Sequence, residues 1–94
     1  MTAVTGTFRR ADGEPSDGYI RFTLHPAARN SDGDQVTCAA VYGILTDGML
    51  AVDLVPDSEL IVDGTAVYEV SEFIDGCRRT WWLILTDEEP VDLP

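Results

Sequence analysis

Apolar and polar residues alternate in several short segments of the chain. Between residues 19 and 24, the apolar side chains of Ile20, Phe22 and Leu24 are separated by polar ones. Neighbouring side chains of a strand point to opposite faces, so this pattern predicts a half-buried strand with one face on a core. The same alternation predicts strands at residues 4–8, 49–54 and 66–74, with these inward residues: Val4, Gly6, Phe8, Leu50, Val52, Leu54, Tyr68 and Val70.

Two longer runs, at residues 36–46 and 80–85, are apolar at odd and even positions alike and rich in β-branched and aromatic residues. A strand that is apolar on both faces suits the centre of a sheet, so these runs predict central strands. The segment 57–63 places Leu60, Ile61 and Val62 between acidic residues. Either a short edge strand or a single helical turn fits it.

Six of the eight glycines directly follow an aspartate. Asp-Gly between apolar runs is a strong hairpin signal, because both residues tolerate the positive φ that tight turns need. Turns this frequent leave segments of strand length, and none of them has a clean helical period. The sequence therefore predicts an all-β fold, a two-sheet antiparallel sandwich of immunoglobulin or transthyretin type with six to seven strands.

The C-terminal segment differs from the rest of the chain. Residues 87–94 contain four acidic residues and two prolines, which predicts an extended acidic tail or linker. A chain of 94 residues has room for one domain, so we expect the sandwich to occupy residues 1–86.

Composition limits the classes of partner. Hydrophobic residues make up 45% of the chain, as in folded proteins, and 17 Asp and Glu against six Arg give a formal net charge of −11. Nucleic acids and anionic membrane surfaces both require a cationic protein surface, so neither is an expected partner. The N-terminus lacks the apolar run of a signal peptide, and no segment approaches the about 20 apolar residues of a membrane span. We therefore expect synthesis in a cytoplasm.

Residues with catalytic chemistry are sparse. His25 is the only histidine, and the serines do not form a Gly-x-Ser-x-Gly elbow. Most acidic residues fall in turns, where solvent keeps carboxylates ionised, whereas a hydrolase needs a carboxyl group in a cleft with a raised pKa. The sequence thus predicts a protein that is not an enzyme and has no cofactor.

The segment after residue 29 spaces Asn30, Asp32 and Asp34 at alternate positions, as at the start of a calcium loop. Gln35 and Val41 stand where such a loop has its glycine and its glutamate. A polar loop with Asx turns explains the same residues, so no metal is expected.

The two cysteines, Cys38 and Cys77, form neither a CxxC pair nor a zinc spacing. Two readings stay open. The cysteines are either joined in a disulfide or present as two small, semi-buried thiols in strands.

Adjacent tryptophans, Trp81 and Trp82, fall in one predicted strand, so one indole should face the core and the other solvent. Alternation with Ile84 favours Trp82 as the inward residue, whereas Leu83 and Leu85 fit the opposite assignment. The outer indole is a candidate contact for a partner protein or a sugar ring, unless arginines or the C-terminal tail cover it. Tyr42, in the run at residues 36–46, is the third candidate partner-binding residue.

Several loose motifs occur in a recognisable order. The first are Val4-x-Gly6-x-Phe8, Asp12-Gly13-x-Pro15-x-x-Gly18-x-Ile20-x-Phe22 and Asp47-Gly48-Met49-Leu50-Ala51-Val52. This opening resembles carboxypeptidase-regulatory-like and transthyretin-like sandwiches, in which a strand, an Asp-Gly-x-Pro turn and a Gly-led second strand recur.

The later motifs are Tyr68-Glu69-Val70-x-Glu72, the Gly76 turn, Arg79-x-Trp81-x-Leu83 and Val91-Asp92-Leu93. With them, nearly the whole chain is similar to small modules in minor tail proteins, tail fibres and virion surface proteins of phages infecting actinobacteria. The chain departs from that pattern at Val62-Asp63-Gly64, where Pro-x-Gly is more usual. The resemblance implies a structural or adhesive role and no catalytic residue.

These observations predict a non-enzymatic virion structural protein, attached to a tail or capsid surface through contacts with other virion proteins. Self-association stays open, since closed symmetry is common among oligomers. The alternative function is a carbohydrate-binding module that adheres to host surface glycans.

Overall fold

The computed structural model describes residues 1–30, 32–61, 66–86 and 90–93. In this part of the chain the regular elements are β-strands and one turn of 3-10 helix, which confirms the predicted all-β class. The strands are β1 (Thr2–Thr7), β2 (Gly18–His25), β3 (Ala28–Asn30), β4 (Gln35–Val36), β5 (Val41–Ile44), β6 (Met49–Leu54), β7 (Leu60–Ile61), β8 (Val67–Ile74), β9 (Cys77–Leu83) and β10 (Val91–Asp92). The Asp63-Gly64 turn and the acidic residues 87–89 lie outside the described residues.

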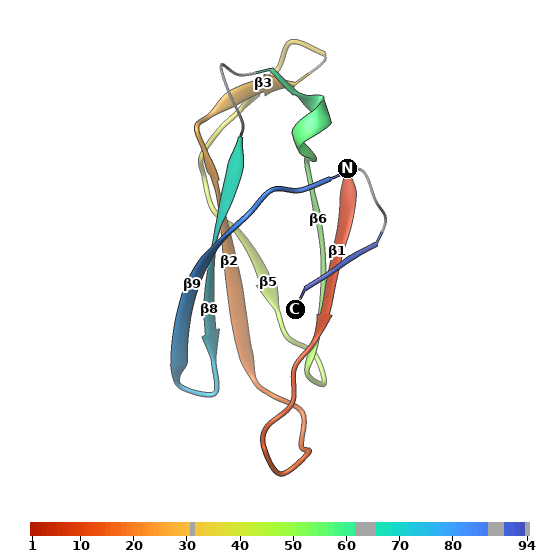
Figure 1. Cartoon of the computed structure of the whole chain (residues 1–94), viewed down its shortest axis with the longest axis vertical. Coiled ribbons are helices and arrows are strands. Elements are labelled where there is room, and N and C mark those ends of the chain that lie inside the picture. The colour runs from red at the N-terminus through yellow and green to blue at the C-terminus, as the bar shows by residue number, and fades with distance from the viewer. Residues whose placement is uncertain (31, 62–65, 87–89, 94) are drawn as a thin grey trace.

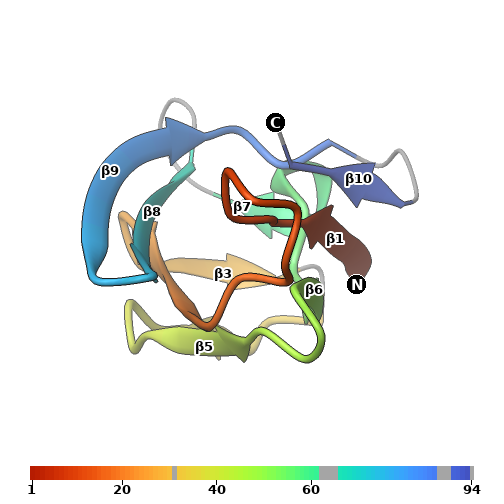
Figure 2. The ribbon, with the colours of Figure 1, turned by 90° about the horizontal axis from the view of Figure 1, so that it is seen from below.

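Two sheets form the sandwich. One has the strand order β10-β1-β6 and the other the order β5-β2-β8-β9, and their long strands run along the long axis of the molecule (Figure 1). Viewed along that axis, β5, β8 and β9 form one wall and β1, β6 and β10 lie opposite (Figure 2). A third sheet, β4-β3-β7, lies at one end and was not predicted. The pairing is antiparallel except between β1 and β10.

Alternating residues of the facing sheets fill the core. Ile20, Phe22 and Val70 are fully buried, and Leu50 and Val4 cover them from the other sheet. The predicted inward residues of the strands at 4–8, 19–24, 49–54 and 66–74 are confirmed, with Phe8 and Val52 at the core margin. Periodicity identified these strands correctly because apolar core residues alternate with polar ones, although Ser71, on the outer side of β8, is 1% exposed beneath its hydrogen bond from Arg21.

Two Asp-Gly pairs form tight hairpin turns. Asp47 and Gly48 have φ values of 51° and 75°, and Asp75 and Gly76 have values of 52° and 78°. Positive φ at both central residues is the type I′ geometry, which matches the twist of the flanking strands. These turns join β5 to β6 and β8 to β9, as the sequence predicted.

The run at residues 36–46 is not one central strand. It is divided into β4 and β5 by a loop, and β5 lies at the edge of the four-stranded sheet. The second two-sided apolar run contributes to β9, which lies at the opposite edge. Both predictions of central strands are therefore wrong: one face of each strand packs on the core and the other bears exposed apolar side chains.

The segment predicted as an extended acidic tail or linker joins the sandwich. Val91–Asp92 pairs in parallel with β1, and Leu93 is buried in the core. The Leu93 amide also donates to the Thr5 carbonyl oxygen at 2.8 Å. The segment is extended, as predicted, but the domain boundary at residue 86 does not hold for these residues. Val91 and Leu93 face the core from this segment, and its acidic composition gave no indication of that packing.

The segment after residue 56 contains both alternatives that the sequence left open. Asp57–Glu59 forms the 3-10 helix η1, and Leu60–Ile61 forms β7 directly after it. Val62, the last apolar residue of this segment, lies outside the described residues.

Candidate functional site on the outer face of the four-stranded sheet

The solvent side of the sheet β5-β2-β8-β9 carries most of the exposed aromatic surface. Its residues alternate with core residues along each strand and lie side by side through the strand register. We call this surface the outer aromatic face and define it by these residues: Tyr19, Arg21, Tyr42, Ile44, Glu69, Phe73, Arg78 and Trp82.

Aromatic residues are divided evenly between the outer aromatic face and the core. Of the eight in the chain, four lie on the outer aromatic face. The other four, Phe8, Phe22, Tyr68 and Trp81, belong to the core or pack against it. The outer surface of the opposite sheet bears none of them, and its residues are small or polar except for Met49. The two outer surfaces of the sandwich are thus chemically different.

Three rings lie in contact at one end of the face. Tyr19 stacks on Phe73 with ring centroids 4.9 Å apart and an angle of 22° between planes. Tyr42 packs against Tyr19 from the edge strand at 5.8 Å. Cross-strand aromatic pairs of this kind stabilise a sheet, and they also fix each ring in place before any partner arrives.

Two arginines lie over the same aromatic ring. The guanidinium carbons of Arg21 and Arg78 are 5.5 Å and 5.2 Å from the centroid of Phe73. Within the part of the chain that the structure describes, neither arginine forms an ion pair. A guanidinium that stacks on a ring keeps its in-plane N–H donors available, so both arginines can bind a carboxylate.

Trp82 is the exposed tryptophan. Its side chain is 59% exposed and lies across from Glu69, with His25 edge-on at 5.7 Å. The expectation from alternation with Ile84 is therefore wrong, because Ile84 itself faces solvent. Trp81 lies across from Val70, which is fully buried, so the strand register sets Trp81 toward the core.

Glu72 is a buried carboxylate that the sequence did not single out. Its Oε2 accepts a hydrogen bond from Trp81 Nε1 at 2.6 Å and two from the Arg79 guanidinium, at 2.6 and 3.2 Å. Arg79 also lies over the Trp81 ring at 5.7 Å. The signal was present: Glu72 continues the inward alternation of Tyr68 and Val70. This interaction orients Trp81 and thereby the strand that presents Trp82.

A shallow pocket of about 340 Å³ opens beside Glu72, with Arg9, Arg78 and Arg79 among its lining residues. Because the Glu72 oxygen nearest the arginine already accepts three hydrogen bonds, this carboxylate serves the packing of β9.

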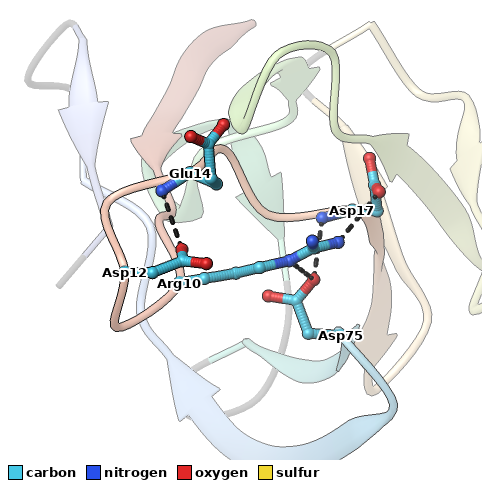
Figure 3. Close-up of polar contacts among 5 residues, drawn as sticks. All are labelled: Arg10, Asp12, Glu14, Asp17 and Asp75. Carbon is cyan, nitrogen blue, oxygen red and sulfur yellow. Dashed lines mark hydrogen bonds and ion pairs between the residues drawn. The ribbon is translucent and has the colours of Figure 1, made fainter.

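An ion-pair cluster ties the β1–β2 loop to the β8–β9 hairpin (Figure 3). Arg10 donates to Asp75 Oδ1 at 3.0 Å and to Asp17 Oδ2 at 3.1 Å. Hydrogen bonds from the Ser16 hydroxyl, the Asp17 amide and the Arg10 guanidinium hold the pKa of Asp75 below its usual value. The bond to Asp75 in turn raises the pKa of Arg10. This cluster fixes the hairpin that begins β9.

The loop considered for calcium contains an Asx turn. Asn30 Oδ1 accepts hydrogen bonds from the Asp32 and Asp34 amides at 3.0 and 2.9 Å. Among the residues that the structure describes, no three His, Cys, Asp or Glu side chains gather as metal ligands. Ser31, within the same loop, is not described.

Both cysteines are free, so the structure contains no disulfide between Cys38 and Cys77. Both thiols are exposed rather than semi-buried, and only Cys77 lies in a strand. In the described ranges, no helix has the length and apolar character that crossing a membrane would require. Comparisons with protein-family models and with curated proteins find no match.

Proposed function

We propose that this chain is a non-enzymatic structural module of a phage virion, which joins tail or capsid proteins through the outer aromatic face. One observation carries the proposal: the exposed aromatic side chains lie on one sheet surface together with two arginines that form no ion pair among the described residues. Tyrosine, tryptophan and arginine are the residues enriched where protein interfaces gain most of their binding energy.

The arrangement of the side chains supports a docking role. Stacking of Tyr19, Phe73 and the two arginines holds these side chains in place before binding, which lowers the entropy cost of association. The position of β5 and β9 at the sheet edges leaves Tyr42 and Trp82 accessible. The order of sequence motifs supports the assignment to a virion, and Glu72, bound by Arg79, supports a structural use of the buried carboxylate.

The test compares occupancy on purified particles for two variants of matched exposure. Trp82→Ala removes a 59% exposed side chain from the outer aromatic face, and Met49→Ala removes one of equal exposure from the opposite sheet. We expect Trp82→Ala, with or without Tyr42→Ala, to lower the amount of protein per particle at least about tenfold, because interface aromatics act as anchors. Met49→Ala should assemble normally.

Circular dichroism verifies that each variant is folded. Wild-type occupancy of the double variant Tyr42→Ala, Trp82→Ala would contradict the assignment of this face, and absence of the wild-type protein from particles would contradict the virion role.

A carbohydrate-binding module is the second candidate. The observation that favours it is the exposed Trp82 ring with the His25 ring edge-on beside it, since a sugar can stack on an open indole face. Binding to a glycan array that disappears in Trp82→Ala would favour adhesion to host glycans. A silent array would favour the structural role.

A further inference from the structure

The outer aromatic face carries charges of both signs that form no ion pair within the described ranges of the chain. Arg21 lies across from Ser71, and Glu69 precedes Ser71 by two positions on the same side of β8. Arg21 and Glu69 are therefore diagonal neighbours on one surface. Among the described residues they form no ion pair with each other or with a third group.

A twofold axis can pair these charges between two copies. In an isologous contact, residue i of one protomer meets residue j of the other and j meets i. An axis in the plane of the interface that crosses the line from Arg21 to Glu69 at its midpoint and at a right angle brings each Arg21 to Glu69 of the partner subunit. Two ion pairs then form within a surface of aromatic side chains that excludes water.

We propose that the partner at the outer aromatic face is a second copy of this chain, related by such a twofold axis. This inference rests on the proposed function and narrows it: the virion protein that the outer aromatic face joins is a second copy of the same chain. The module would then be incorporated into the virion as a dimer.

The distribution of charge favours this occupant. The chain has a formal net charge of −11, but the face has two arginines against one glutamate, which gives +1. Face-to-face contact therefore turns most of the acidic surface of both copies outward, where salt screens the repulsion within about 8 Å at physiological ionic strength. Contact through the opposite sheet would bring Asp53 and Asp92 of both copies together.

The size of the molecule is compatible with this contact. A stable interface buries about 800 Å² per partner. That is about one seventh of the 5687 Å² surface of the chain, and one broad face of a two-layer sandwich can supply it.

Exchange of the two charges tests the proposal without any other partner. Arg21→Glu sets two glutamates against each other across the axis, and Glu69→Arg sets two arginines against each other. At 0.15 M salt we expect the wild type to sediment at twice the mass of the chain. Each single variant should dimerise at least about tenfold more weakly, since like charges in an interface are strongly unfavourable.

Mixing gives the decisive result. An equimolar mixture of Arg21→Glu and Glu69→Arg restores both opposite-charge pairs, so it should form heterodimers more tightly than either variant forms a dimer alone. The double variant should also dimerise. Arg29→Glu and Asp53→Arg change the net charge by the same amounts at exposed positions outside the face, and both should behave as wild type.

A monomeric wild type at about 100 μM, or single variants that dimerise as wild type does, would overturn the inference. If the wild type is monomeric in solution and Trp82→Ala still removes the protein from particles, the proposed function is supported and the dimer is contradicted. If the protein dimerises with the expected exchange pattern but is absent from particles, the dimer is supported and the virion role is contradicted.

Discussion

At the scale of single residues, strand register sets Trp81 inward, and a hydrogen-bond acceptor from the neighbouring strand meets its indole N–H there. Glu72 Oε2 accepts the Trp81 indole proton at 2.6 Å, and the Arg79 guanidinium neutralises the carboxylate. An inward indole needs a partner for its N–H, and Glu72 provides it from the neighbouring strand. The acceptor, and not hydrophobicity alone, explains how a large polar ring fits the inner side of an edge strand.

Two replacements of Glu72 should separate its hydrogen bond to the Trp81 indole from its ion pair with Arg79. Glu72→Ala leaves the indole N–H and the guanidinium without a partner, and we expect it to lower the free energy of unfolding by about 2 kcal/mol. Glu72→Gln keeps an oxygen acceptor for the indole, so its loss should be smaller, about 1 kcal/mol, because Arg79 is largely exposed. Urea unfolding followed by circular dichroism measures both. Equal losses would contradict a specific role for the acceptor.

Tyr68 gives a dependence on alkaline pH. Burial raises the pKa of its phenol from 10.0 to about 12, and its hydroxyl donates to the Val55 carbonyl oxygen at 2.8 Å. Below pH 10 the phenol is neutral in the folded and the unfolded chain. Between pH 10 and about 12 only the unfolded chain ionises, so the free energy of unfolding should fall as pH rises.

Urea unfolding from pH 8 to 12 tests this step. Tyr68→Phe should lack it, at the cost of about 1 kcal/mol at neutral pH for the lost hydrogen bond. Tyr42→Phe, on the exposed face, is the matched control and should keep it. A step of unchanged size in Tyr68→Phe would assign the effect to another group.

At the scale of elements, the two type I′ hairpins have the same dihedral geometry in different surroundings. A side chain at Gly76 would meet open space, whereas a Cβ atom at Gly48 would lie 2.5 Å from the Phe8 carbonyl oxygen. That oxygen accepts a hydrogen bond from Ser16, and the Phe8 amide donates to Gly48. The β5–β6 turn is thus packed against the start of the β1–β2 loop at its glycine, whereas the β8–β9 turn is held through Asp75 and leaves the space around Gly76 open.

Alanine at each glycine separates backbone strain from steric contact. Gly76→Ala should cost about 1 kcal/mol, which is the usual penalty for an alanine at positive φ. Gly48→Ala has the same penalty and also displaces Phe8, so we expect a loss of about 3 kcal/mol or more. Thermal unfolding compares the two. Equal shifts in midpoint would show that the Phe8 contact gives way without cost.

Sequence patterns predicted those strands that have one buried and one polar face. Ile20, Phe22 and Leu24 required no tertiary information, because the alternation itself distinguishes the two sides. The pattern failed at β5 and β9, where both sides are apolar and the choice depends on strand order, which is a long-range property. The same ambiguity limited the prediction of the candidate site. Trp82 and Tyr42 were identified from the sequence, but their place on one surface depends on the register across β2 and β8.

At the scale of the whole molecule, the sandwich separates its chemistry by surface. One sheet presents rings and guanidinium groups, the other presents small and polar side chains, and the ion pairs of Arg10 fix the loops at one end. The net charge of −11 is a sum over surfaces of different composition, so it does not describe any single surface. The outer aromatic face, with two arginines against one glutamate, does not share this excess of negative charge. That difference could be recognised only once the strand order was known.

The contrast between the two tryptophans has a practical consequence for spectroscopy. They are neighbours in sequence, but one indole is hydrogen-bonded within the fold and the other is open to water. Fluorescence from Trp81 follows the integrity of the core, while fluorescence from Trp82 and its access to quenchers follow whatever covers the sheet. Edge strand β9 therefore contains two natural optical reporters, and the unlabelled chain can distinguish unfolding from docking in a single titration.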